Sequence, residues 1–133
     1  MQNYRISNTV ESYEVIGVMS GTSVDGLDLA CCRFTHAKPR WNFEILQAIS
    51  INYNEQWRRK LLDVINASAE NIFNLDNEFG EFIGNQVNQF INMYRLNPRL
   101  IASHGHTVFH QPSRHISLQI GNGMTINNLT GIT

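Results

Sequence analysis

A run of glycines and hydroxyl side chains, SGTSVDG at residues 20–26, lies between two β-rich segments and constrains the fold more than any other feature. Residues 13–19 (YEVIGVM) are β-branched or aromatic at most positions, and residues 27–34 (LDLACCRF) are apolar on both faces of an extended chain. Glycines tolerate the backbone angles of tight turns. The pattern predicts two strands joined by a short turn that is rich in N–H and O–H donors.

The rest of the chain predicts further strands and two main helices. Apolar side chains at every second position from Trp41 to Ile51, with Gln47 the one break, indicate a strand with one buried face, whereas residues 27–34 indicate a strand buried on both sides. Asn54 and Ser68 are suited to cap helices. In chain order, the predicted elements after the hairpin are a strand over residues 41–51, helices over 54–66 and from Ser68 to the Asn97-Pro98 pair, a strand over 99–103 that runs into a loop over 104–111, a strand over 116–120 and a short helix over 124–129.

This order of elements predicts an α/β fold. Three strands joined by tight turns, followed by a helical crossover into further strands, form a mixed sheet that opens with three antiparallel strands and carries helices on its faces. The 133 residues suffice for one domain. We expect a loose tail over residues 1–12 and one domain over residues 13–133. A Gly-Ile-Thr at the end looks like the start of another strand, so we expect the domain to continue in a longer protein.

Composition excludes several classes of partner. The net charge is −1, so no basic excess marks a surface for nucleic acid or anionic membrane. No apolar run approaches the roughly 18 residues of a membrane span, and residues 1–14 lack the apolar core of a signal peptide. Cys31 and Cys32 are adjacent and cannot easily bridge each other, which favours a reducing compartment. We therefore expect a cytoplasmic protein that binds neither nucleic acid nor membrane.

The turn itself has the chemistry of an anion site. Small residues let backbone N–H groups approach a phosphate closely, and the hydroxyls of Ser20, Thr22 and Ser23 can donate to its oxygens. No lysine follows the glycines, as a Walker loop requires, and a strand follows instead of the helix of a dinucleotide fingerprint. Asp25 and Asp28 are suited to hold a hydrated Mg²⁺ beside phosphates. The alternatives are an ordinary glycine-rich hairpin, with one carboxylate as a turn residue and the other paired with a cation.

Four of the five histidines lie between residues 104 and 115. Their spacing matches no standard zinc pattern, and no Cys, Asp or Glu in that segment completes a ligand set, so zinc is disfavoured. Residues 103–107 (SHGHT) follow a strand, where α/β sheets place ligand contacts, and this indicates hydrogen bonding to a polar substrate. For His110 and His115 we favour loop histidines that bond backbone carbonyls. Residues 119–123 (QIGNG) alone indicate a turn.

Three blocks of the sequence, in order and sensibly spaced, resemble a known family. Residues 17–28 (GVMSGTSVDGLD) are similar to the N-terminal signature of the anhydro-N-acetylmuramic acid kinases, a branch of the actin/hexokinase-like ATPase superfamily with ribonuclease H-like lobes. Residues 103–112 (SHGHTVFHQP) and 118–121 (LQIG), which lead to Thr-Gly-Ile at 130–132, are similar to the family's next blocks. The resemblance covers the chain from Tyr13 onward and matches the first third of such a kinase.

The resemblance implies a bacterial kinase that uses ATP and Mg²⁺. Such enzymes cleave the 1,6-anhydro bond of anhydro-N-acetylmuramic acid with water and phosphorylate O6, giving N-acetylmuramic acid 6-phosphate in peptidoglycan recycling. The resemblance places the catalytic Asp beyond Thr133, so we expect the 133 residues alone to be inactive. Asp25 is the implied Mg²⁺ residue, acting through water. The implied nucleotide-binding residues are Ser20, Gly21, Thr22, Ser23, Val24, Asp25, Gly26, Leu27 and Asp28, and the implied substrate-binding residues are His104, Gly105, His106 and Thr107.

Two other functions stay open on the sequence. One is a non-catalytic remnant or binding module that needs a partner chain to supply the missing lobe. The other is a His-rich metal-binding domain. We also expect an unfinished sheet edge and an uncovered core to favour aggregation or pairing of this chain. For the complete kinase, a homodimer is the expected assembly.

Overall fold

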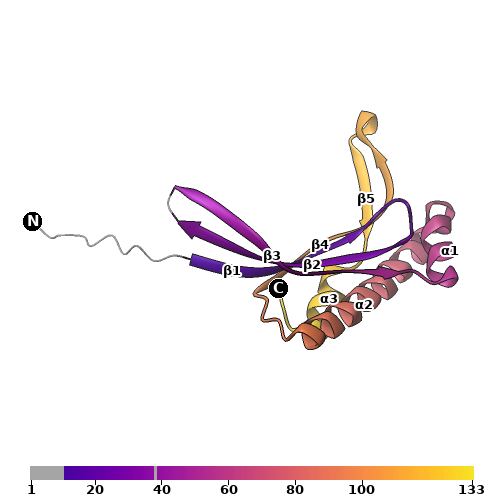
Figure 1. Cartoon of the computed structure of the whole chain (residues 1–133). Coiled ribbons are helices and arrows are strands. Elements are labelled where there is room, and N and C mark those ends of the chain that lie inside the picture. The colour runs from indigo at the N-terminus through magenta and orange to yellow at the C-terminus, as the bar shows by residue number, and fades with distance from the viewer. Residues whose placement is uncertain (1–10, 38) are drawn as a thin grey trace, which may run out of the picture.

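The structure, a computed structural model, describes residues 11–37 and 39–133. Five strands form one open sheet in the order β3-β2-β1-β4-β5 (Figure 1). Strands β1, β2 and β3 are antiparallel neighbours, β4 runs parallel to β1, and β5 is antiparallel to β4. This confirms the predicted mixed sheet with three antiparallel opening strands. The strands are β1 (Glu11–Ser20), β2 (Gly26–Ala37), β3 (Arg40–Asn52), β4 (Leu100–Gln111) and β5 (Ile116–Ile120).

Helices form the crossover from β3 to β4 and end the chain. They are α1 (Glu55–Asp63), continued by a 3-10 turn (Val64–Asn66), α2 (Ala69–Tyr94) and α3 (Gly123–Thr130), and a second 3-10 turn (Pro112–Arg114) joins β4 to β5. Both predicted caps are confirmed: the Trp57 N–H donates to Asn54 Oδ1 at 2.9 Å, and the Asn71 N–H donates to Ser68 Oγ at 3.2 Å. These caps satisfy N–H groups that have no partner within the helix.

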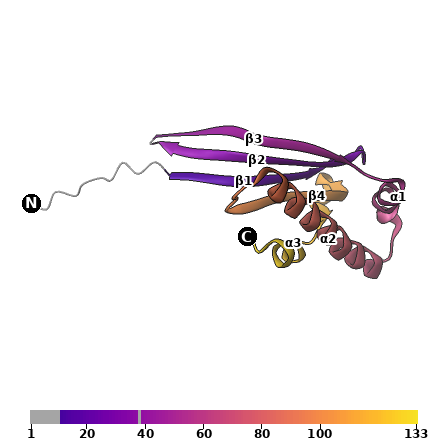
Figure 2. The same ribbon diagram turned by 60° about the horizontal axis from the view of Figure 1, so that its bottom comes forward.

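The three helices lie on one side of the sheet (Figure 2). The core forms between that side of β1 and β2 and the apolar stripe of α2. Its fully buried members include Ile16, Leu27 and Leu29 from the strands and Phe79, Ile83, Val87 and Phe90 from α2. The other side of the sheet carries no helix among the described residues, so the core is one-sided.

Strand β4 is longer than the sequence indicates. The loop predicted over residues 104–111 is wrong, because these residues continue β4 to Gln111 and pair with β5. Residues 100–103 pair with β1, and the register shifts before His106, which is opposite both Ser20 and Ile120. Beyond that point β4 and β5 rise from the sheet as an arm (Figure 1). The polar side chains and Gly105 resemble a loop locally, and only the pairing with β5 reveals the strand.

The buried face predicted along β3 is wrong for its first half. Cys31 pairs with Gln47 but Cys32 pairs with Ile45, so a bulge interrupts the ladder there. Consecutive strand residues point to opposite faces, and the extra residue therefore turns Phe43 and its alternate neighbours away from the helices. The Phe43 side chain is 70% exposed, whereas Ile49 packs against the core.

The structure also bears on three smaller predictions, which concern the burial of β2, the N-terminal tail and the cysteines. On the second face of β2, Asp28 and Phe34 are exposed and Ala30 and Cys32 are only partly buried, so burial on both sides is wrong for that strand. Glu11 and Ser12 belong to β1, while the rest of the predicted tail, residues 1–10, lies outside the described residues. Cys31 and Cys32 are free thiols, as predicted. Over residues 11–37 and 39–133, no helix combines the length and apolar character that crossing a membrane requires.

Candidate phosphate-binding site

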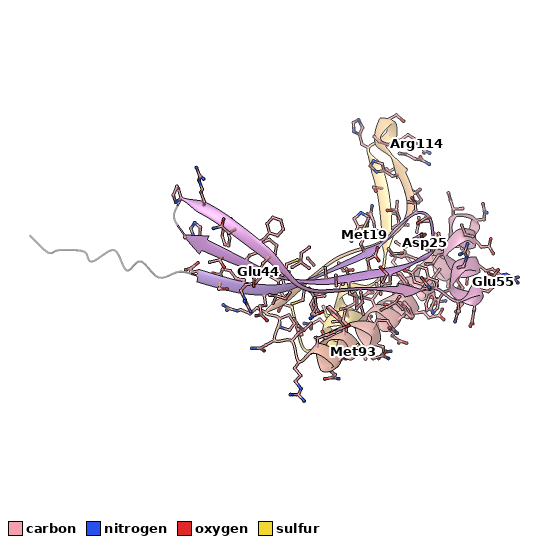
Figure 3. All side chains as sticks on the ribbon, in the orientation of Figure 1. Met19, Asp25, Glu44, Glu55, Met93 and Arg114 are labelled. Atoms are coloured by element: carbon pink, nitrogen blue, oxygen red, sulfur yellow. The ribbon has the colours of Figure 1, made fainter. Side chains whose placement is uncertain are left out.

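The glycine-rich turn lies at the carboxyl end of β1. Because β1 and β4 are parallel, the turn and the register shift of β4 come to the same edge of the sheet, where Ser20 is opposite His106. Ligands of α/β proteins gather at this edge. Figure 3 shows Asp25 at this end of the molecule and Glu44 toward the other end.

The backbone of the turn is strained. The Val24 N–H donates to the Gly21 carbonyl at 3.2 Å, and Val24 has a φ of 52°. A left-handed conformation is rare for a β-branched residue, and such residues cluster at functional sites. Thr22 and Ser23 are exposed, and within the described part of the chain their N–H groups donate to no backbone carbonyl. The outer side of the turn is therefore open and offers unused donors.

The residues proposed for nucleotide binding divide into two groups. Ser20, Val24 and Leu27 are buried, with exposed fractions of 2%, 1% and 0%, so their side chains face the interior. The outward group holds exposed or half-buried residues: Gly21, Thr22, Ser23, Asp25, Gly26 and Asp28. At Gly26 an added Cβ would lie 2.6 Å from the Ile51 carbonyl oxygen, so only glycine fits where β2 meets β3.

The two candidate carboxylates lie in different surroundings. Asp25 Oδ1 accepts a hydrogen bond from Ser23 Oγ at 2.8 Å, and this bond is the main cause that lowers the pKa of Asp25. Asp28 accepts from Ser50 Oγ and lines the hollow described below. Asp25 is thus an exposed, ionised carboxylate on the turn itself. Mg²⁺ is commonly held through one or two carboxylates together with phosphate oxygens, and Asp25 fits that donor set.

Three polar side chains meet beneath the turn. Tyr53, directly after β3, donates its hydroxyl to Ser20 Oγ at 2.8 Å, and Ser20 Oγ lies 3.5 Å from His106 Nδ1. The His106 ring is 3% exposed and lies edge-on to Phe79. Burial lowers the pKa of His106, although a hydrogen bond to the Leu61 backbone partly opposes that shift. The structure therefore puts the imidazole of His106 inside the protein, supporting the turn from below.

The other residues proposed for substrate contact surround this point. His104 is exposed and, with Met19, Asp28 and other residues, lines a shallow hollow of about 510 Å³ on the helix-free side of the sheet. Thr107 is half-buried. Gly105 has a φ of +69°, and an added Cβ would lie 2.2 Å from the Ile120 carbonyl oxygen. Glycine is therefore required at the point where β4 changes partners.

The remaining histidines of the cluster lie along the arm. His110 Nδ1 is 3.3 Å from Ser117 Oγ, a side-chain partner in place of the predicted backbone carbonyl. The backbone N–H of His115 donates to the Pro112 carbonyl, and the His115 side chain is exposed. Within residues 11–37 and 39–133, no group of three or more His, Cys, Asp or Glu side chains is arranged to hold a metal ion.

The amino-acid sequence matches one protein family over most of its length. The family model of anhydro-N-acetylmuramic acid kinase matches residues 13–133. The chain belongs to this kinase family. Proteins named anhydro-N-acetylmuramic acid kinase include one from Pseudoalteromonas translucida, 38% identical over 90% of this chain and 33% of its own length. Another from Crocosphaera subtropica is 36% identical over 88% of this chain and 32% of its own length. This chain thus spans about a third of the length of these relatives.

The open five-stranded sheet with three helices forms part of an actin-like, ribonuclease H-like ATPase lobe. The structure also reveals residues that the motifs of this kinase family do not indicate. Asp76 of α2 accepts from the Gly121 N–H at 2.8 Å and from Asn122 Nδ2 at 2.9 Å, and so fixes the turn between β5 and α3. Tyr53 is the other. Its partner Ser20 is 33 positions away, so no local pattern reports the contact.

Proposed function

We propose that this chain forms the nucleotide-phosphate site of a kinase that acts on anhydro-N-acetylmuramic acid. The complete protein would cleave the 1,6-anhydro bond with water and transfer a phosphate from ATP to O6. Residues 13–133 would form most of one lobe. The catalytic Asp would lie beyond Thr133, so this chain alone would catalyse neither step. A kinase that consumes ATP works where ATP is abundant, and this supports a cytoplasmic location.

The observation that carries the proposal is the outward face of the turn. Thr22 and Ser23 present their N–H groups to solvent, Thr22 also presents its hydroxyl, and buried neighbours hold the turn from the inside. Donors that are already oriented bind phosphate without the cost of ordering them. Donors fixed in this way can also stabilise charge that develops during phosphoryl transfer. The same turn chemistry occurs in the family signature that the chain matches.

Asp25 is the residue that would hold Mg²⁺ through water. Its carboxylate is exposed and its lowered pKa keeps it ionised at neutral pH. When bound, Mg²⁺ would bridge phosphate oxygens and offset their negative charge. Ser23 Oγ keeps Asp25 in place by its hydrogen bond, so the carboxylate is oriented toward the turn's solvent side.

The substrate side of the proposal rests on the start of the arm. His104 is exposed beside the hollow and is positioned to hydrogen-bond a hydroxyl or amide of a sugar. Gly105 and Thr107 would add backbone and hydroxyl contacts. His106 would support these residues from the interior, because its ring is buried against Phe79.

Binding of MgATP to the isolated chain tests the site. We expect NMR amide shifts on titration to concentrate at Thr22 and Ser23. Asp25→Asn should weaken the Mg²⁺-dependent part of binding, whereas Asp63→Asn, a change at an exposed carboxylate in α1, should not. Shifts scattered over the surface, or equal effects of the two substitutions, would contradict the proposed site.

Activity tests the reaction. The chain mixed with ATP, Mg²⁺ and the anhydro sugar should give no phosphorylated sugar by mass spectrometry. A chimera in which residues 13–133 replace the matching third of the Pseudoalteromonas translucida relative should give the 6-phosphate. Product from the chain alone would refute the inactive-fragment proposal, and a folded chimera that binds MgATP without forming product would refute the substrate assignment.

A further inference from the structure

One residue, Tyr53, contacts both ends of the phosphate turn. Its N–H donates to the Asp25 carbonyl at 3.0 Å, and its hydroxyl donates to Ser20 Oγ at 2.8 Å. Ser20 is the last residue of β1, and Asp25 is the residue before β2. Tyr53 therefore joins the entrance and the exit of the turn from outside the hairpin.

Aromatic neighbours fix the Tyr53 ring. The side chain is 6% exposed, and its ring centroid lies 6.2 Å from that of Phe79 and 5.9 Å from that of Phe82. Trp57 packs on the same two phenylalanines, so the ring belongs to a cluster anchored on α2. A side chain held by such packing keeps its hydroxyl at one place.

The hydroxyl of Tyr53 serves as a permanent donor. Burial raises the pKa of Tyr53 to about 12, so the phenol stays protonated near neutral pH. Ser20 Oγ accepts this bond and lies 3.5 Å from Nδ1 of the buried His106. The Ser20 hydroxyl is therefore part of a buried hydrogen bond beneath the turn.

We propose that Tyr53 is a positioning residue that holds the phosphate turn in its binding conformation before nucleotide arrives. The inference rests on the proposed function of the turn. A turn that contains a left-handed Val24 relaxes unless its neighbours hold it. Tyr53 provides that restraint at both ends. Without its hydroxyl, part of the binding free energy goes into ordering the turn, and nucleotide affinity falls.

Tyr53→Phe is the direct test, because it removes only the hydroxyl and keeps the packed ring. We expect the dissociation constant of the chain for MgADP, measured by NMR titration or calorimetry, to rise about three- to tenfold, as the loss of one hydrogen bond allows. Tyr13→Phe is the matched control. It removes a tyrosine hydroxyl that bonds Glu11 at the far end of the sheet and should leave the affinity unchanged.

A double substitution separates positioning from general destabilisation. Ser20→Ala removes the acceptor of the same bond, so the combination with Tyr53→Phe should weaken binding little more than either change alone. Val87→Ala in the core should lower the melting temperature without changing affinity for MgADP. Additive losses, or an equal loss in Val87→Ala, would overturn the positioning role.

The ligand-free protein provides a readout that is independent of binding. In Tyr53→Phe, amide hydrogen exchange at Val24, whose N–H donates to the Gly21 carbonyl across the turn, should accelerate more than exchange in α2. If the unchanged chain binds no MgADP but this exchange accelerates, the proposed function fails and the restraint on the turn stands. If the unchanged chain binds MgADP, and Tyr53→Phe changes neither the affinity nor the exchange, Tyr53 does not restrain the turn and the proposed function stands.

Discussion

The two halves of the β2–β3 hairpin have similar apolar patterns but opposite surroundings. Near the phosphate turn, Leu27 and Leu29 of β2 are buried beneath the helices, and Ile49 of β3 packs against them. Beyond the bulge, Phe43 and Trp41 lie on the helix-free side, 70% and 57% exposed. An alternating pattern thus reports which residues share a face, but one bulge decides which side of the sheet that face belongs to.

The largest expected contrast comes from equal truncations in the two regions. Phe79→Ala, in the core under the covered half, should lower the free energy of unfolding by about 3–5 kcal/mol, because it leaves a cavity among packed aromatic rings. Phe43→Ala in the open half should cost less than about 1 kcal/mol. Urea denaturation followed by circular dichroism measures both. Similar costs would show that the open half is covered in solution.

A second contrast uses two glycines with the same φ of +69°, Gly105 and Gly131. Gly105→Ala places a methyl group against the Ile120 carbonyl oxygen and should cost about 3 kcal/mol or more. Gly131→Ala has no atom within 4 Å of the added carbon, so only the left-handed backbone is penalised, by about 1 kcal/mol. The comparison separates crowding from backbone strain, and thermal unfolding of the two variants checks it.

Carboxylates provide the third contrast. Asp76→Ala leaves the Gly121 N–H and the Asn122 amide without their acceptor in a partly buried place, and should cost about 1–3 kcal/mol. Glu44→Ala breaks an exposed ion pair with Arg33 in the open half, where about 0–1 kcal/mol is expected. Denaturant titrations at low and high salt measure both variants. Only the free-energy cost of Glu44→Ala should decrease as the salt concentration rises.

The smallest expected effect concerns how the stability of the covered half depends on pH. Burial lowers the pKa of His106 in the folded protein, so the unfolded chain binds the proton more readily. The contribution of His106 is then fully present above its ordinary pKa of 6.5 and declines as pH falls below it toward the lowered value. His106→Gln should flatten this part of the stability profile, whereas Phe43→Ala in the open half should leave its shape unchanged. An unchanged profile in His106→Gln would contradict a buried neutral imidazole.

Local chemistry made much of the fold predictable. Asn54 and Ser68 cap helices through their own side chains, and the glycine turn joins neighbouring strands, so short segments carry these signals. The second half of β4 was missed because its strand character depends on pairing with β5, and because Gly105 and the polar residues around it resemble a loop. The exposed face of β3 was missed because a bulge leaves no mark in an alternating sequence.

The candidate site was predictable only on its outer side. Thr22, Ser23 and Asp25 stand together in the sequence, so their donors and carboxylate are visible as a motif. The supports beneath them come from distant positions: Tyr53 is 33 residues from Ser20, and His106 is 86 residues from it. Such contacts exist only once the sheet has formed, and a motif cannot report them.

The inward and outward division of the turn also separates two kinds of natural selection. Folding depends on Ser20, Val24 and Gly26, because these residues pack inside or fit a close backbone approach. Thr22 and Ser23 are exposed, and the Ser23 hydroxyl bonds the exposed Asp25, so both residues contribute little to folding. A descendant that lost catalysis would therefore keep the inward residues and drift at the outward ones. Outward hydroxyls that persist in a lineage therefore indicate that the turn is still used for binding.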